Sequence, residues 1–121
     1  MSKNISVILV CLNYEESCKL SINSIIKSNS INHLFQELII VVGYKSDRKK
    51  ILEKYKDFNT KSFKLEVEIS RNGIYAAYNH GLKIARGKYL LFIGDGEEIN
   101  CEISFLSQLE KYLKLITKDT K

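Results

Sequence analysis

The chain has 121 residues, 45% hydrophobic and 27% charged, with a formal net charge of +5. This length supports one domain with one core, and no apolar run approaches the roughly 20 residues of a membrane-spanning helix. The positive charge is spread over lysines without an arginine-rich stripe interleaved with aromatic residues, so we expect no nucleic-acid partner.

Three cysteines, Cys11, Cys18 and Cys101, form an odd set without the paired spacing of a metal site. The apolar start at residues 5–12 lacks a basic leader and a small-residue cleavage site, so we interpret it as a strand. Together these features predict reduced, buried thiols and a cytoplasmic location. Lysines near the end of the chain suggest peripheral contact with the inner face of a membrane.

The first half of the chain begins with residues 5–12, an uninterrupted apolar run typical of a parallel strand covered on both faces. Asn13 can cap a following helix, which we expect to end at residues 28–30. Four apolar residues recur at helical spacing in this segment: Cys18, Ile22, Ile25 and Ile26. This part of the sequence therefore predicts a strand followed by a helix.

A second strand is predicted at residues 38–42, where Gly43 ends the apolar run. Ser46 or Asp47 can cap a second helix that runs to about residue 58. The residues expected on its inner side are Ile51, Leu52 and Tyr55. After a polar loop at residues 59–62, apolar and polar residues alternate from 63 to 69, which predicts a third strand near a sheet edge.

The last part of the chain predicts a helix over residues 73–86, a stop at Gly87 and a fourth strand at residues 89–93. The residues expected on the inner side of that helix are Ile74, Ala77, Tyr78, Gly81, Leu82 and Ala85. An amphipathic helix is predicted from Glu102 onwards. Strands that alternate with helices indicate a Rossmann-like α/β/α fold, with a mostly parallel sheet of about four strands, in a single domain over residues 1–121.

Four segments in register resemble the family 2 glycosyltransferases. Residues 5–13 are similar to their first strand, which ends in Thr-Tyr-Asn or Thr-Leu-Asn, and residues 37–42 to their second strand. Residues 73–81, Gly-Ile-Tyr-Ala-Ala-Tyr-Asn-His-Gly, resemble a Gly-Ile-Tyr-Asp-Ala-Met-Asn-Lys-Gly segment. Residues 88–93 resemble the strand that delivers the Asp-x-Asp motif. The resemblance covers about residues 5–98.

The resemblance implies a GT-A fold whose first half binds a nucleotide-diphosphate sugar. It also implies inverting transfer of a hexose-type sugar to a saccharide or lipid-linked acceptor, as in cell-surface polysaccharide biosynthesis. The donor-binding residues that it assigns are Cys11, Leu12, Asn13, Gly43, Tyr44, Arg71, Asn72, Gly73 and Asp95. Each also has an ordinary structural interpretation, such as a strand end, a helix cap or a solvated side chain.

The family's acidic motif is replaced here by Gly94-Asp95-Gly96-Glu97. The glycines fall on the Asp-x-Asp positions, and a shift of one residue would make Asp95 and Glu97 an oxygen pair for Mg²⁺ or Mn²⁺. The alternative is a solvated acidic turn before a helix. Gly43 and Ala76 also stand where the family has aspartates.

No catalytic base is identifiable, since the later candidates Glu102, Glu110 and Asp119 lie on a predicted helix or in the tail. The sequence therefore predicts a donor-binding half without its acceptor half, which a second copy or a partner chain could supply. Two alternatives remain. One is a degenerate GT-A domain that acts as a binding or assembly subunit. The other is a flavodoxin-like or receiver-like module, which the residues after the first strand, Leu12 to Glu16, do not favour.

Overall fold

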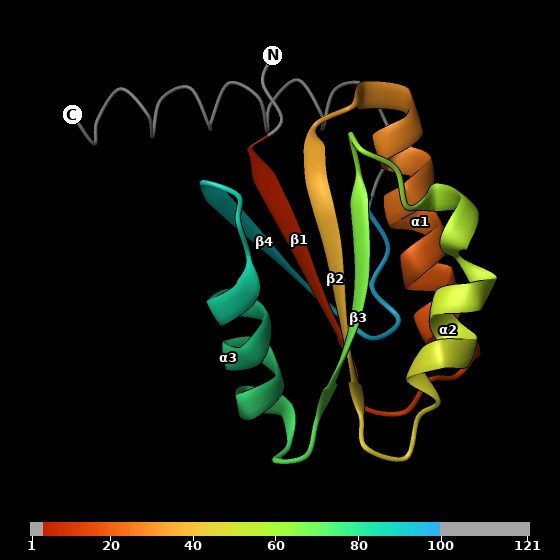
Figure 1. Cartoon of the computed structure of the whole chain (residues 1–121), viewed down its shortest axis with the longest axis vertical. Coiled ribbons are helices and arrows are strands. Elements are labelled where there is room, and N and C mark those ends of the chain that lie inside the picture. Colours follow the sequence, from red (N-terminus) through yellow and green to blue (C-terminus); the bar gives the residue numbers. More distant parts are fainter. Residues whose placement is uncertain (1–3, 100–121) are drawn as a thin grey trace.

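The structure, a computed structural model, describes residues 4–99 and is an α/β fold of three layers (Figure 1). A parallel sheet with the strand order β3-β2-β1-β4 separates α1 and α2 on one face from α3 on the other. The elements are β1 (Ile5–Cys11), α1 (Glu16–Asn32), β2 (Phe35–Gly43), α2 (Arg48–Lys54), a 3-10 turn (Lys56–Phe58), β3 (Lys64–Ser70), α3 (Ile74–Ile84) and β4 (Tyr89–Gly94). The predicted fold class is confirmed, and the helix predicted from Glu102 lies outside the described residues.

The central strands β1 and β2 are apolar because both of their faces are covered. Val7 and Leu9 of β1 belong to the larger core cluster, which includes residues of α1 and α2. Ile8 and Val10, which alternate with them, belong to the smaller cluster with Ala77 of α3. The period-two alternation of a strand thus distributes one apolar run between two cores.

The order of the strands determines where a ligand can bind. The chain moves outward from β1 to β2 and β3, then returns through α3 to place β4 on the other side of β1. In open parallel sheets, ligands bind outside the carboxyl ends of the strands, near the point where the strand order reverses. Here that end carries the loops that follow β1, β2, β3 and β4.

The first helix differs from its prediction at both ends. It begins at Glu16 with no side-chain cap, so Asn13 is a loop residue and not its N-cap. It also continues through residues 28–30, because the Ser30 hydroxyl donates to a carbonyl of the helix itself and the Asn29 side chain accepts from Phe35 N at 2.9 Å. The side chains of these polar residues, which would otherwise favour a helix end, have their hydrogen-bond partners within the folded chain. The helix ends instead at Asn32, and its C-cap residue His33 adopts a left-handed conformation with φ 55°.

The second and third helices are partly as predicted. Asp47 caps α2 by accepting from Lys50 N at 3.1 Å, but the α-helix ends at Lys54 and a 3-10 turn follows. In α3, the prediction was wrong for Ile74 and Leu82, which are 48% and 47% exposed. Gly81 allows α3 to approach β1, because a Cβ there would lie 2.6 Å from Ile8 Cγ2.

Cys11 and Cys18 are fully buried and form a disulfide across the turn from β1 to α1, with Cα atoms 6.0 Å apart. Their burial was predicted, but the prediction of reduced thiols was wrong for this pair. The helical spacing of Cys18 points it at the end of β1, so the two sulfur atoms meet. Within residues 4–99 no helix has the length and apolar character needed to cross a membrane.

A buried carboxyl group ties the amino ends of the strands together. Glu37 of β2 is 1% exposed and accepts from the Ser6 hydroxyl at 2.5 Å and from Arg86 N at 2.7 Å. Ser6 in turn accepts from Gly87 N at 2.7 Å. The Arg86 guanidinium lies 3.5 Å from Glu37 Oε1 and also pairs with Glu66 of β3. This Glu37 network anchors the segment between α3 and β4 to the other three strands.

We predict that Glu37→Ala lowers the free energy of unfolding by about 3 kcal/mol or more, because it leaves buried donors unpaired. Urea denaturation of the full chain would measure the change. Glu66→Ala is the matched control, since it removes an exposed partner of the same arginine and should cost less than about 1 kcal/mol. Equal losses for the two variants would contradict the central role of Glu37.

Candidate functional site

A pocket of about 320 Å³ lies at the carboxyl ends of β1, β2 and β3. Its lining residues are Leu12, Asn13, Gly43, Tyr44, Lys45, Ser70, Arg71 and Gly73. Three loops that are far apart in sequence meet here because their parallel strands end at the same edge of the sheet. We call this cavity the strand-end pocket.

Six of the nine residues predicted to bind the donor line this pocket. The three others do not: Cys11 is fully buried in the disulfide, Asn72 is exposed beside the pocket lining, and Asp95 lies after β4. Sequence reasoning missed Lys45 and Ser70. Lys45 could have been found because it follows Tyr44, and Ser70 because it lies at the carboxyl end of β3.

Tyr44 is the aromatic residue of the pocket and is 57% exposed. The guanidinium carbon of Arg71 lies 6.0 Å from its ring centroid, and Lys45 Nζ lies 5.9 Å from it. Both distances are at the outer limit of a cation–π contact. The pocket therefore combines a ring that can stack on a planar group with two cations that can face an anion.

The glycine at position 43 has a steric cause. Gly43 N donates to the carbonyl oxygen of Leu12 at 3.0 Å, and a Cβ on Gly43 would collide with that oxygen. The loops after β1 and β2 thus approach each other more closely than any larger residue at 43 allows. In this chain the carboxylate that the family resemblance leads one to expect there is excluded by the backbone.

The acidic loop after β4 is closed by its own side chain. Glu97 Oε1 accepts from Gly94 N at 2.5 Å, and Glu97 N donates to Gly94 O at 3.0 Å. Asp95 Oδ1 accepts from the Ser17 hydroxyl of α1 at 2.7 Å. Burial, followed by the charge of Glu97, raises the pKa of Tyr78, whose hydroxyl donates to Ile93 O at 3.4 Å. Tyr78 therefore acts as a neutral donor that holds the end of β4.

The two predicted metal ligands fit a cation only in combination with a ligand that brings further oxygens. Among residues 4–99 there is no group of three or more His, Cys, Asp or Glu side chains arranged to hold a metal ion. Asp95 and Glu97 each use one carboxylate oxygen in the hydrogen bonds above, which leaves a second oxygen on each. Mg²⁺ commonly binds through one or two carboxylates together with phosphate oxygens and water.

Comparison with known proteins places the chain in a family. Residues 6–114 match the family described as Glycosyl transferase family 2, and the chain therefore belongs to the family 2 glycosyltransferases. No individual curated protein matches the sequence. The resemblance inferred from the four sequence segments is confirmed.

Solved structures agree with the GT-A fold. Residues 1–349 of S. aureus TarS in complex with UDP-GlcNAc match with a TM-score of 0.71 and 26% identity, covering 91% of this chain and 31% of that one. Glucosyl-3-phosphoglycerate synthase from Mycobacterium tuberculosis, in complex with Mg²⁺ and UDP, matches with a TM-score of 0.54 and 23% identity over 79% and 35% of the two chains. The chain thus spans about a third of each of these two solved chains.

We predict that Gly43→Ala destabilises the chain by about 1–3 kcal/mol, because the new Cβ must push the Leu12 backbone away. Thermal and urea unfolding would measure the loss. Lys45→Ala is the control, since it removes an exposed side chain from the same loop and should change stability by less than about 0.5 kcal/mol. If Gly43→Ala had native stability, the Leu12 backbone would move aside at no cost, which would contradict the steric explanation for the glycine.

Proposed function

We propose that the chain is the donor-binding part of a glycosyltransferase and binds a nucleotide-diphosphate sugar. The nucleobase of the donor would occupy the strand-end pocket, and its diphosphate would extend towards Asp95. The observation that carries this proposal is the meeting of Leu12, Tyr44 and Arg71 at one pocket at the carboxyl ends of the strands. The UDP-GlcNAc bound to S. aureus TarS supports a uridine nucleotide as the first donor to test.

The proposed roles follow from the chemistry of each side chain. The Tyr44 ring would stack on the base, and the cations of Arg71 and Lys45 would attract the phosphates. Asp95, with Glu97 if it releases Gly94 N, would hold Mg²⁺ or Mn²⁺. When bound, such a cation would neutralise the diphosphate, which is the leaving group in sugar transfer.

Inverting transfer to a saccharide or lipid-linked acceptor requires a base that deprotonates the acceptor hydroxyl. We place this base outside residues 4–99. The histidine of α3, His80, is not assigned this role, because it does not line the strand-end pocket and its Nε2 lies 3.0 Å from the Glu68 carboxylate of β3. The acceptor half would come from further sequence, a second copy or a partner chain. In this proposal the protein acts in the cytoplasm or at the inner face of the membrane.

The second candidate function is a non-catalytic GT-A domain that serves as a binding or assembly subunit. Three positions favour it, because Gly43, Ala76 and Gly94 stand where carboxylates are expected. The close contact between Gly43 and Leu12 gives one of these losses a structural cause. Donor hydrolysis or sugar transfer by the purified chain, abolished by Asp95→Ala, would exclude this candidate.

We predict that UDP binds to the chain and that Arg71→Ala weakens binding by about tenfold to a hundredfold, because a charge-assisted contact to phosphate is worth about 1.5–3 kcal/mol. Isothermal titration calorimetry with UDP and UDP-GlcNAc would measure the change. Tyr75→Ala is the control, since Tyr75 is 84% exposed and does not line the pocket. Failure of every nucleotide sugar to bind, with and without metal, would exclude the donor-binding proposal.

We also predict that Mn²⁺ strengthens UDP binding and that Asp95→Asn removes this gain while leaving metal-free binding unchanged. The reason is that the amide keeps the size of the side chain but loses the charge that a hard cation prefers. The matched control is Glu98→Gln, a neighbouring exposed carboxylate for which no role is proposed. A gain that survives in Asp95→Asn would place the metal elsewhere.

A further inference from the structure

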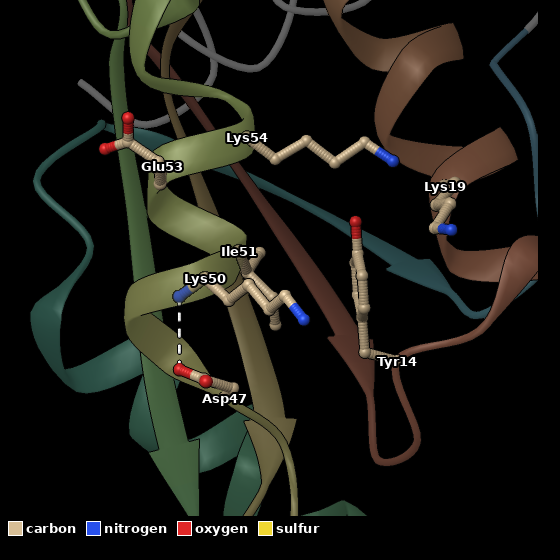
Figure 2. A pocket seen from close by; sticks show the side chains of 7 residues that line it. All are labelled: Tyr14, Lys19, Asp47, Lys50, Ile51, Glu53 and Lys54. Carbon is tan, nitrogen blue, oxygen red and sulfur yellow. Dashed lines mark hydrogen bonds between the residues drawn. The ribbon is translucent and has the colours of Figure 1, made fainter.

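A second cavity, of about 520 Å³, lies between the start of α1 and helix α2 (Figure 2). It borders the strand-end pocket along the chain, since Asn13 lines one and Tyr14 the other. Its volume is within the range of about 300–1,000 Å³ that is usual for small-molecule sites. We call it the lysine cavity, because Lys19, Lys50 and Lys54 line it.

Two of the three ammonium groups lie beside aromatic rings, Lys19 Nζ beside Tyr14 and Lys54 Nζ at 5.8 Å from the ring centroid of Tyr55. Figure 2 shows the side chains of Lys19, Lys50 and Lys54 reaching towards Tyr14 from different sides of the cavity. Lys19 Nζ lies 5.8 Å from the ring centroid of Tyr14 and 2.8 Å from Glu16 Oε1. Lys19, and to a smaller extent the charge of Lys54, lower the pKa of Glu16, so Lys54 also faces this carboxylate. Within residues 4–99, no carboxylate oxygen lies within ion-pair distance of Lys50 or Lys54 Nζ.

The two carboxylates that line the cavity are already engaged. Asp47 accepts from Lys50 N as the cap of α2. Glu53 pairs with Lys56 Nζ at 2.7 Å, and Figure 2 shows its carboxylate pointing away from the three ammonium groups. Lys19 is paired with Glu16, and Glu53 with Lys56. The charges left at the cavity are those of Lys50, Lys54 and Asp47, so the positive excess is small.

The aromatic wall adds no negative charge. The Tyr14 hydroxyl donates to the hydroxyl of Tyr55 at 3.2 Å, and Tyr55 is 3% exposed. Burial, with the hydrogen bond to Tyr14 as a smaller cause, raises the pKa of Tyr55, so this phenol stays neutral. A charged ligand would thus meet ammonium groups on several sides and a neutral ring beside them.

We propose that the lysine cavity binds a small soluble phosphate ester with at least two negative charges. Ammonium groups bind phosphate as compact point charges, and a doubly charged anion would pair with both Lys50 and Lys54. A cavity, in contrast to a flat basic face, favours a small ester over the headgroups of a lipid surface. This site is separate from the strand-end pocket, so it would take a second ligand beside the nucleotide.

The test uses fructose 1,6-bisphosphate as the probe, titrated calorimetrically into the full chain at low ionic strength. The double variant Lys50→Gln/Lys54→Gln should weaken binding by about tenfold or more. Lys49→Gln/Lys83→Gln is the matched control, because it removes the same charge from exposed lysines that do not line the cavity. The control should stay within about twofold of the native chain. Circular dichroism would verify that both variants are folded.

Three results would overturn the proposal. The first is absence of binding, or equal weakening in the two double variants, which would indicate attraction by net charge alone. The second is that Arg71→Ala weakens binding of the bisphosphate while Lys50→Gln/Lys54→Gln does not, which would assign the probe to the strand-end pocket. The third is binding to phosphatidylglycerol vesicles without binding of the bisphosphate, which would indicate a lipid surface. UDP binding by Lys50→Gln/Lys54→Gln should remain native, so failure here is distinguishable from failure of the donor site.

Discussion

The buried carboxyl group of Glu37 is the interaction on which the rest of the structure depends. It lies at the amino end of β2 and holds both Ser6 of β1 and the backbone of Arg86, just before β4. This contact helps fix the register in which β4 joins β1, where Ser6 pairs with Leu90 and Val10 with Gly94. In a strand each residue advances by about 3.3 Å, so an anchor at one end decides where the loop emerges at the other. A slip of one residue would also exchange the two faces of β4.

The acidic loop therefore reaches the switch point of the sheet because of contacts at the far end of the strands. Its side chains are then used locally: Glu97 closes the loop on Gly94, and Asp95 joins it to Ser17 of α1. The part of the proposed donor site that would hold the nucleobase is well formed, with the Tyr44 ring and the cations of Lys45 and Arg71. The proposed metal end offers only Asp95 and Glu97, so further oxygens around a cation would have to come from the ligand and water.

The turn from β1 to α1 serves two cavities at once. Asn13 lines the strand-end pocket, and the next residue, Tyr14, lines the lysine cavity. The Cys11–Cys18 disulfide joins the two ends of this turn and is buried in the core. Neighbouring residues of this turn thus line different cavities.

Much of the fold follows from the sequence alone. The apolar runs at residues 5–12, 38–42 and 89–93, separated by helical periodicity, are sufficient to predict a parallel α/β sheet. Only the first two runs are covered on both faces, because β4 is an edge strand and is half-buried. The same local patterns carried the family resemblance. Loops at the carboxyl ends of parallel strands meet at one edge, so the positions of six of the nine predicted donor residues along the chain are sufficient to assign them to one pocket.

Only the tertiary structure decided how these pieces are used. The collision that keeps position 43 a glycine depends on the path of the Leu12 loop, and the pairing of Cys11 with Cys18 depends on how α1 turns over β1. Ile74 and Leu82 match the helical period of the inner face but are exposed, because Gly81 and Ala77 are the residues of α3 that pack against the sheet. Likewise, only packing brings Lys19 of α1 to the same cavity as Lys50 and Lys54 of α2. The sequence by itself determined which segments become strands and helices, since hydrophobic periodicity is local. Which side chains meet is set by packing between distant segments.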